Sequence, residues 1–440
     1  MFNKITSLNN HLFSSLLISF FPVSFILGNS AINLNIFLII LYSIFVFFSK
    51  RENTDINFIF IDKLIIIFLF YISFVTFLNY LKLPDGDQSD QLIIKSVSYI
   101  RYFIFYFALR FLINKNFFDY RFFLLSSSIC VIFVSLDIVF QYNFGRDIFG
   151  FEAVPRRMAG PFGDELIAGG YLSRFALFLI FLFFIFKNLK NIQFKIRFPL
   201  YIITSTILSF GLILAGNRVP FLIFLVMVFL CFVLFKNYRI FFISFFLISI
   251  CSLITLIKFD EGVKKHYGAF QTKIINFVQP FSEDKKIKNE DLGNLTKVEK
   301  KYTFTYKGEV FIAPTVHAKE FYTGFKTWNE NKFFGGGIKS FRYNCPKVFV
   351  NCNNHPHNYY LEILTDLGLL GFFIIISLFA YVFYKAYISK KIILIPFWII
   401  LFGEVFPLKT TGSFFSTSNS TFIFLFLSLI VSMLGRKDLN

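Results

Sequence analysis

Long apolar runs constrain this chain more than any other feature of its sequence. Runs of about 18 residues or more, separated by charged clusters, recur along its 440 residues. A helix of that length crosses a hydrocarbon core of roughly 30 Å and satisfies its own backbone hydrogen bonds. The chain is 56% hydrophobic and 16% charged, with a mean hydropathy of +0.65. A soluble domain could not bury that much apolar surface. We therefore predict an all-α fold, a polytopic transmembrane helical bundle.

About twelve runs are expected to span the membrane. The first has no convincing small-residue cleavage site and leads straight into the next, so we interpret it as a transmembrane helix rather than a cleaved signal peptide. The predicted spans are 12–28, 31–49, 60–81, 97–114, 121–142, 168–187, 198–215, 218–236, 239–257, 367–385, 391–408 and 419–435.

The short loops predict which side of the membrane each end of a span faces. The loops 49–53, 187–197, 236–239 and 385–391 are rich in Lys and Arg, and they alternate with less basic loops. Since basic loops favour the cytoplasm, the N-terminus is expected to be cytoplasmic. Three polar stretches then lie on the outer face of the membrane: 143–167, 215–218 and 258–357.

The longest of these stretches, 258–357, is expected to be one large loop domain on the outer face. Its part 302–313 alternates like a β-hairpin, and 316–330 has helical spacing that puts Phe325 and Trp328 on one face. The part 282–301 is typical of a disordered spacer. We divide the chain into N-terminal transmembrane helices (1–142), central transmembrane helices with outer arginines (143–257), the loop (258–357) and C-terminal transmembrane helices (358–440).

Arginines at the predicted outer face suit an anionic ligand. Arg218 opens a span whose N-terminus faces outward, and the positive end of a helix dipole beside a guanidinium favours phosphate. The alternative is an interfacial arginine that reaches lipid headgroups. Arg156 and Arg157, before a Gly-Pro turn, would clamp a second anionic group or form a solvated charge pair.

Two of the five histidines flank Pro356 at the start of a predicted helix near Asn358. His355 and His357 are candidates for a general base, because imidazole titrates near neutrality. A metal site that also uses His317 and Glu362 is the competing interpretation. The chain has no HxxxH or HExxH spacing, so we predict no metal and no cofactor.

The loop also holds a pair of cysteines and a run of three glycines. Cys345 and Cys352 would close a small disulfide ring in an oxidising compartment, and two free thiols are the alternative. Gly335 and Gly337 belong to the segment NKFFGGGIKSF, which suits a tight turn or close backbone approach, or a flexible connector. The cysteines inside spans, Cys130, Cys231 and Cys251, are interpreted as inert apolar residues.

The residues that follow the second histidine resemble the signature of the bacterial O-antigen ligase and O-antigen polymerase superfamily. That signature is His-Asn, nine residues, Gly, two residues, Gly, and here it runs from His357-Asn358 to Gly368 and Gly371. The likeness extends over roughly 150 to 440. Three weaker motifs resemble the family in the same order: Arg157 with Gly160 and Phe162, Gly216 to Arg218, and Gly335 with Gly337 and Phe341.

The resemblance implies an enzyme of the bacterial inner membrane that transfers a glycan from undecaprenyl pyrophosphate at the periplasmic face. The loop 258–357 would then be a large periplasmic loop domain. Arg218, Arg157 and Arg156 would bind the pyrophosphate. His357 would accept the proton of an acceptor hydroxyl while Asn358 orients the imidazole. Gly335 and Gly337 would form the turn, and Gly368 and Gly371 would allow close helix packing. The expected partners are the lipid-linked donor, a lipid A-core or glycan acceptor and membrane lipids, with no nucleic acid.

This sequence departs from the family at two places. Relatives usually have a proline before the glycine turn, where this chain has Lys332. Relatives often have an arginine at the start of the loop helix, where this chain has His317. Arg342 or Lys319 would then have to supply the positive charge. Ligation to lipid A-core is the leading expectation, and polymerisation of lipid-linked repeats is the close alternative. A polysaccharide-lipid flippase is the remote one, for which Asp137 and Glu404 are the candidate intramembrane carboxylates.

Overall fold

The computed structural model of the chain consists mainly of helices. It describes residues 2–49, 58–82, 87–154, 156–185, 194–278, 286–287, 303–306, 309–313, 315–350, 352–409 and 412–436. The helices are α1 (Phe2–Ser19), α2 (Phe21–Leu27), α3 (Asn29–Ser49), α4 (Phe60–Tyr80), α5 (Asp87–Asn114), α6 (Tyr120–Phe144), α7 (Ala168–Ile185), α9 (Phe194–Leu214), α10 (Arg218–Leu234), α11 (Arg239–Phe259), α12 (Glu261–Val278), α14 (Val316–Glu330), α15 (Phe341–Val348), α16 (Tyr359–Ile388), α17 (Ile395–Glu404) and α18 (Thr417–Gly435). The 3₁₀ turns are η1 (Gly160–Phe162), η2 (Lys236–Tyr238) and η4 (Ile392–Leu394).

The described residues include eight helices that are long and apolar enough to cross a membrane, and four shorter apolar ones. Each of the twelve predicted spans falls on one of these helices. The chain is therefore an α-helical membrane protein, while the number of twelve spans stays a prediction. The eight are Asn29–Ser49, Phe60–Tyr80, Asp90–Asn114, Tyr120–Phe144, Lys195–Leu214, Lys236–Phe259, Tyr359–Ile388 and Thr417–Gly435, and the four are His11–Leu27, Ala168–Phe183, Arg218–Leu234 and Ile392–Glu404.

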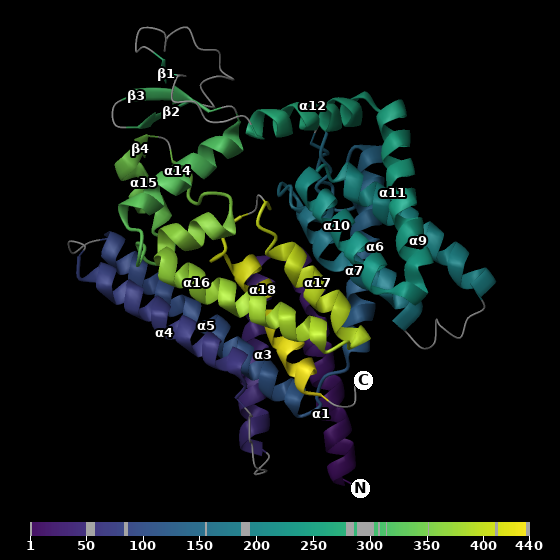
Figure 1. Ribbon diagram of the computed structural model, residues 1–440. Coiled ribbons are helices and arrows are strands. Elements are labelled where there is room, and N and C mark those ends of the chain that lie inside the picture. Colours follow the sequence, from purple (N-terminus) through teal and green to yellow (C-terminus); the bar gives the residue numbers. More distant parts are fainter. Residues whose placement is uncertain are drawn as a thin grey trace.

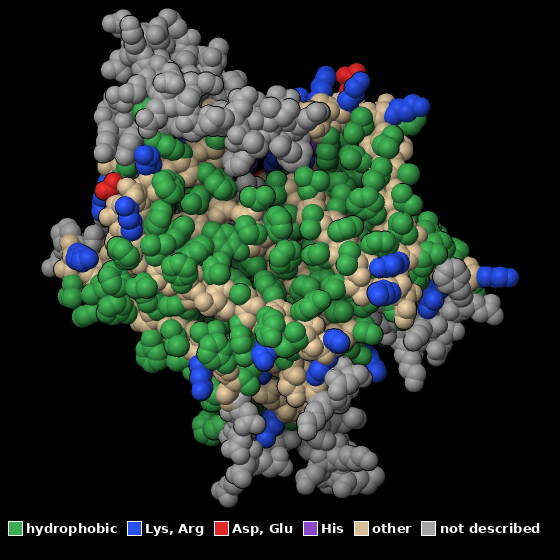
Figure 2. Space-filling view, in the orientation of Figure 1, with side chains coloured by type: hydrophobic (Ala, Val, Ile, Leu, Met, Phe, Trp, Pro, Cys, Tyr) green, Lys and Arg blue, Asp and Glu red, His purple; other side chains and the backbone are tan. Residues whose placement is uncertain are grey.

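The long helices stand together as one bundle (Figure 1). α4 and α5 lie beside α16 on one flank, and α9, α10 and α11 lie on the other. α12, α14, α15 and the strands cover one end of the bundle, and both termini lie at the other end. Figure 2 shows a broad band of hydrophobic side chains over the bundle, with most Lys and Arg side chains toward its margins. Such a band is what a membrane-embedded surface requires.

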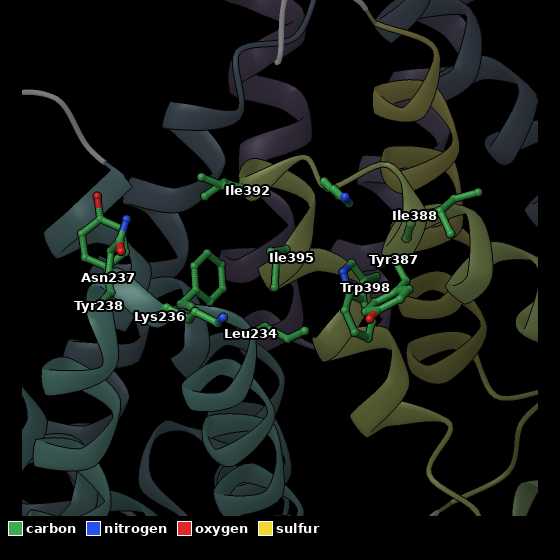
Figure 3. A pocket seen from close by; sticks show the side chains of 12 residues that line it. Leu234, Lys236, Asn237, Tyr238, Tyr387, Ile388, Ile392, Ile395 and Trp398 are labelled. Carbon is green, nitrogen blue, oxygen red and sulfur yellow. The ribbon is translucent and has the colours of Figure 1, made fainter.

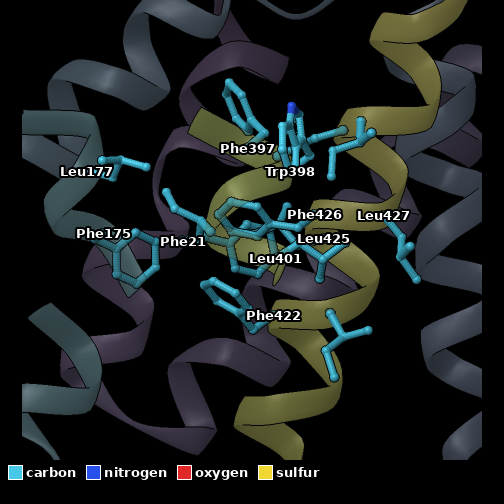
Figure 4. Close-up of a cluster of buried hydrophobic side chains, with 14 of the residues drawn as sticks. Phe21, Phe175, Leu177, Phe397, Trp398, Leu401, Phe422, Leu425, Phe426 and Leu427 are labelled. Atoms are coloured by element: carbon cyan, nitrogen blue, oxygen red, sulfur yellow. The ribbon is translucent and has the colours of Figure 1, made fainter. Parts of the chain in front are cut away.

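α18 runs through the centre of the bundle and is buried along nearly its whole length. Aromatic rings hold it in place: Phe422 and Phe426 stack at 4.3 Å between ring centroids, and Phe178 and Phe397 pack against Phe426 (Figure 4). Phenylalanine therefore fills the interior of this protein as well as its lipid-facing surface.

The loop between α12 and α16 contains a small antiparallel sheet of strand order β1-β3-β2-β4. Its strands are β1 (Lys286–Ile287), β2 (Thr303–Tyr306), β3 (Glu309–Ile312) and β4 (Phe349–Val350). β2 and β3 pair as the predicted hairpin, and α14 is the predicted helix. The expected spacer 282–301 lies outside the described residues, apart from β1.

α14 turns a different face inward than its sequence pattern suggests. Its buried residues are Lys319, Glu320, Thr323, Gly324 and Thr327. Phe325, on the apolar face, is 51% exposed. The inward face meets the start of α16, where a Cβ added at Gly324 would lie 2.9 Å from Cβ of Pro356. Partner geometry, rather than hydrophobicity, therefore decides which face of this helix is buried.

Candidate functional site

The histidine turn, residues 355–358, leads directly into α16. Asn358 is the N-cap of the helix, and its Oδ1 accepts hydrogen bonds from the N–H groups of Tyr360 (3.0 Å) and Leu361 (3.2 Å). Its Nδ2 donates to the carbonyl of Pro407 at 2.8 Å. The predicted helix start is therefore confirmed, and the described contacts give Asn358 a capping and bridging role where we had expected it to orient the imidazole.

Three histidine rings lie together at this turn. The ring centroids of His355 and His357 are 4.4 Å apart, and His317 at the start of α14 lies 6.5 Å from His357. Among the described residues, no group of three or more His, Cys, Asp or Glu side chains is placed to hold a metal ion. The histidine turn and the start of α14 therefore bring three imidazole rings together.

Positive charge surrounds His355. Burial first, and then the charges of His357, Arg342 and Lys339, lower the pKa of His355 to about 4. The same kind of environment, burial first and then Arg342, lowers the pKa of Lys339. Within the described part of the chain, neither Nε of Arg342 nor Nε2 of His355 has a hydrogen-bond partner, although both atoms are buried. Unpaired buried polar atoms in a basic environment suit an anionic or hydroxyl-rich ligand.

The glycine turn, residues 335–337, donates backbone hydrogen bonds from Gly336 and Gly337 to the carbonyls of Thr365 and Asp366 in α16. The segment that follows it is fastened to α16 by one buried carboxylate. Asp366 accepts hydrogen bonds from the backbone N–H groups of Lys339 (2.6 Å) and Phe341 (3.0 Å) and from the hydroxyl of Ser340 (3.0 Å). Sequence reasoning missed Asp366. The available signal was a carboxylate nine residues after His357, inside an otherwise apolar run.

Glycine is needed on both sides of this contact. A Cβ at Gly335 would lie 2.5 Å from the backbone of Asp366, and one at Gly368 would lie 2.2 Å from the carbonyl of Phe333. Both glycines also have positive φ, and α16 kinks at Gly368. At Gly337 and Gly371 an added Cβ would approach side chains, Leu92 at 2.6 Å and Leu367 at 2.4 Å.

A polar cavity of about 380 Å³ opens beside the glycine turn. Its walls come from α4, α5, α14, α15 and α16, and they present mainly amide, hydroxyl and charged groups. These groups include Asn79, Lys82, Thr327, Glu330, Asn331, Ser340, Tyr343, Asn344 and Lys347. Such a lining suits a ligand with many hydroxyl groups.

The disulfide braces the segment that approaches the histidine turn. Cys345 in α15 is bonded to Cys352, with their Cα atoms 6.0 Å apart. Directly after it, Nδ2 of Asn353 donates to Glu320 of α14 at 2.5 Å. Of the remaining cysteines, Cys130 and Cys231 are buried free thiols, and Cys251 is exposed.

The predicted arginines lie together at the same end of the bundle. A Cβ at Gly216 would touch the carbonyl of Arg156 (2.7 Å) and Cγ of Arg157 (2.8 Å). Arg218 begins α10, as predicted, and its Nη1 donates to the carbonyl of His266 at 2.9 Å. These two segments, residues 156–157 and 216–218, together form the arginine turn. His266 belongs to α12, which packs over the arginine turn and was not foreseen from the sequence.

A buried ion-pair network links the arginine turn with the histidine turn. Arg174 of α7 and Lys409 each lie 2.6 Å from the carboxylate of Glu404. Tyr359, next to the cap of α16, donates to the same carboxylate at 2.6 Å. At the start of α7, the N–H of Gly169 donates to Asn217. This network was also missed, because its members lie on different helices.

The carboxylates considered for a transport pathway have local partners. Glu404 belongs to the network just described. Asp137 in α6 accepts a hydrogen bond from the N–H of Ile148 at 3.0 Å. A third intramembrane carboxylate, Asp62, pairs with Arg110 at 2.8 Å. Glu404 and Asp62 are therefore paired with basic groups within the fold. Asp137 has only this backbone partner, and its buried Oδ2 has no hydrogen-bond partner among the described residues.

Comparison of the chain with protein-family models and with curated proteins gave no match. The resemblance of the segment from His357 to Gly371 to O-antigen ligases and polymerases therefore stays a prediction.

Proposed function

We propose that this protein is a membrane glycosyltransferase of the O-antigen ligase type, facing the periplasm. In this proposal a glycan moves from undecaprenyl pyrophosphate to a sugar hydroxyl of lipid A-core. The observation that carries it is the placement of His357 at the start of α16, beside His355, whose environment includes the charge of Arg342. Nε2 of His355 and Nε of Arg342 are buried and have no hydrogen-bond partner among the described residues. A base adjacent to an anion-binding environment is what such a transfer requires.

The acceptor hydroxyl would attack the anomeric carbon while its proton passes to His357. The bond from that carbon to the phosphate oxygen would break, and undecaprenyl pyrophosphate would leave with the bonding electron pair. Arg157 and Arg218 would stabilise the negative charge of the leaving group. The amide, hydroxyl and charged groups that line the polar cavity suit the acceptor glycan.

The test is in vitro transfer by the purified protein from a lipid-linked donor, in the presence of a chelator. His357→Ala is expected to reduce the rate by about 10²–10⁴-fold, as loss of a general base typically does, and His355→Ala to be milder. Glu362 is buried and accepts hydrogen bonds from Ser413 and from the backbone of Phe414, so Glu362→Gln serves as a control for a substitute base. Full activity of His357→Ala would remove the proposed base.

Arg218→Lys tests the pyrophosphate site. Lysine keeps the charge but not the planar fork that matches phosphate oxygens, so activity is expected to fall. Normal activity would favour an arginine that serves only lipid headgroups. Supplying lipid A-core or a second lipid-linked repeat as acceptor separates a ligase from a polymerase.

A further inference from the structure

A second cavity, of about 560 Å³, lies at the opposite end of α16 from the histidine turn. Figure 3 shows the side chains that line it. The end of α10, η2, the end of α16, η4 and the start of α17 enclose it. The loops that form it, 236–239 and 385–391, are two of the basic loops that the sequence predicts on the cytoplasmic side. The cavity therefore belongs to the predicted inner membrane surface.

The cavity combines apolar walls with positive charge. Leu234, Ile388 and Ile395 contribute apolar surface, and Lys236 and Lys390 contribute ammonium groups. Its lining contains no acidic residue. An apolar space with only positive charges at its edge matches an amphiphile that has an anionic head.

A buried hydrogen-bond donor also lines this cavity. Trp398 is 9% exposed, and its indole N–H has no acceptor among the described residues. In Figure 3, Trp398 and Lys236 lie on opposite sides of the cavity. A buried N–H without a partner costs free energy unless a bound molecule accepts its hydrogen bond.

We propose that this cavity binds an anionic glycerophospholipid of the inner leaflet. Its acyl chain would lie against the apolar walls, and its phosphate would be held by Lys236 and Lys390. A phosphate or ester oxygen would accept the hydrogen bond of Trp398. The apolar walls argue against free phosphate, and the position at the predicted inner surface argues against a substrate of the histidine turn. The proposal does not depend on the glycosyltransferase function.

Tryptophan fluorescence can report on this site directly, because the chain has two tryptophans. Trp328→Phe leaves Trp398 as the only emitter. We expect brominated phosphatidylglycerol in nanodiscs to quench Trp398 at a lower mole fraction than brominated phosphatidylcholine does. Each basic residue near an anionic surface contributes about fivefold in affinity, so a preference of that order or more is expected.

The variant Lys236→Gln/Lys390→Gln is expected to lose this preference while quenching by phosphatidylcholine is unchanged. Arg239→Gln/Lys385→Gln is the matched control, since these cations lie on the same loops but do not line the cavity, and it should keep the preference. Equal quenching of the parent protein by both lipids, or a preference that survives in the first variant, would overturn the proposal. A competition experiment adds an unlabelled compound to the protein quenched by brominated phosphatidylglycerol. Recovery of Trp398 emission on adding inorganic phosphate would also overturn the proposal. So would recovery with undecaprenyl phosphate at a lower mole fraction than unlabelled phosphatidylglycerol needs.

Discussion

His357 has φ of 52°, a left-handed conformation that residues other than glycine seldom adopt. The conformation costs about 1–2 kcal/mol. It occurs between Pro356 and Asn358, the cap of α16, so the imidazole lies at the helix start. Backbone strain of this kind is common at functional sites.

His357→Gly separates the backbone role of this residue from its chemical role. Glycine adopts positive φ without cost, so the melting temperature is expected to stay the same or rise. Transfer activity is expected to fall by about 10²–10⁴-fold, because the imidazole is lost. Melting and transfer assays on one preparation check this prediction. An active glycine variant would show that the histidine serves only the turn.

Glu320 gives the loop a pH dependence of known sign. Burial raises the pKa of Glu320 to about 7, although Lys319 and Asn353 act in the opposite direction. In the unfolded chain the carboxyl titrates near 4.5, so the folded state binds the proton more tightly. The stability that this group contributes is present below about pH 4.5 and is lost as the pH rises through 7.

Glu320→Gln is therefore expected to raise the melting temperature at pH 8 and to change it little at pH 4. The amide stays neutral and can still accept the hydrogen bond of Asn353. Glu330→Gln, at an exposed position of the same helix, should have little effect at either pH. A Glu320→Gln variant that is less stable at pH 8 than the parent would contradict the sign.

At the scale of elements, the glycine turn and the kink of α16 depend on each other. Gly335→Ala and Gly368→Ala place a methyl group against backbone atoms at positive φ, and each is expected to cost about 2–5 kcal/mol. Gly170→Ala in α7, where an added Cβ meets nothing within 4 Å, is the control and should be neutral. Thermal unfolding in detergent measures all three. Wild-type stability of both test variants would contradict the close approach.

The sequence predicted elements whose signals are local. Hydropathy located the apolar helices, Asn358 marked a helix start, and the pair Cys345 and Cys352 indicated a disulfide. It missed elements that are defined by distant partners. α12 over the arginine turn and the inward polar face of α14 depend on surfaces far away in the sequence. Asp366 was missed for the same reason, since its partners lie on another segment.

At the scale of the whole molecule, Glu404 joins three helices through its partners. Glu404→Gln leaves Arg174 and Lys409 buried without their shared counter-charge, so we expect a loss of about 3–5 kcal/mol. Arg174→Gln should cost less, because Glu404 keeps Lys409. Glu152→Gln removes an exposed pair with Arg146 and should change stability by less than about 1 kcal/mol. A larger loss of stability for Arg174→Gln than for Glu404→Gln would contradict this account.

The two ends of the bundle are expected to face opposite sides of the membrane. In a Cys251→Ser background, Asn329→Cys of α14 should react with an impermeant thiol reagent in cells with a permeabilised outer membrane. Arg239→Cys, next to η2, should react only after the inner membrane is lysed. Both positions are exposed, so access alone decides the result. Labelling in the opposite order would reverse the predicted topology.

Because α14 buries its polar face, the loop that contains it cannot be exchanged by itself with the loop of another protein. α14 buries Lys319, Glu320 and Thr323 against the start of α16, and the glycine turn closes around Asp366. A fragment limited to 258–357 would lose those partners and expose the polar groups that they cover. A transferable module must therefore contain at least the loop together with α16 as far as Gly371. A recombination boundary placed just after the histidine turn would separate two halves of one folding unit.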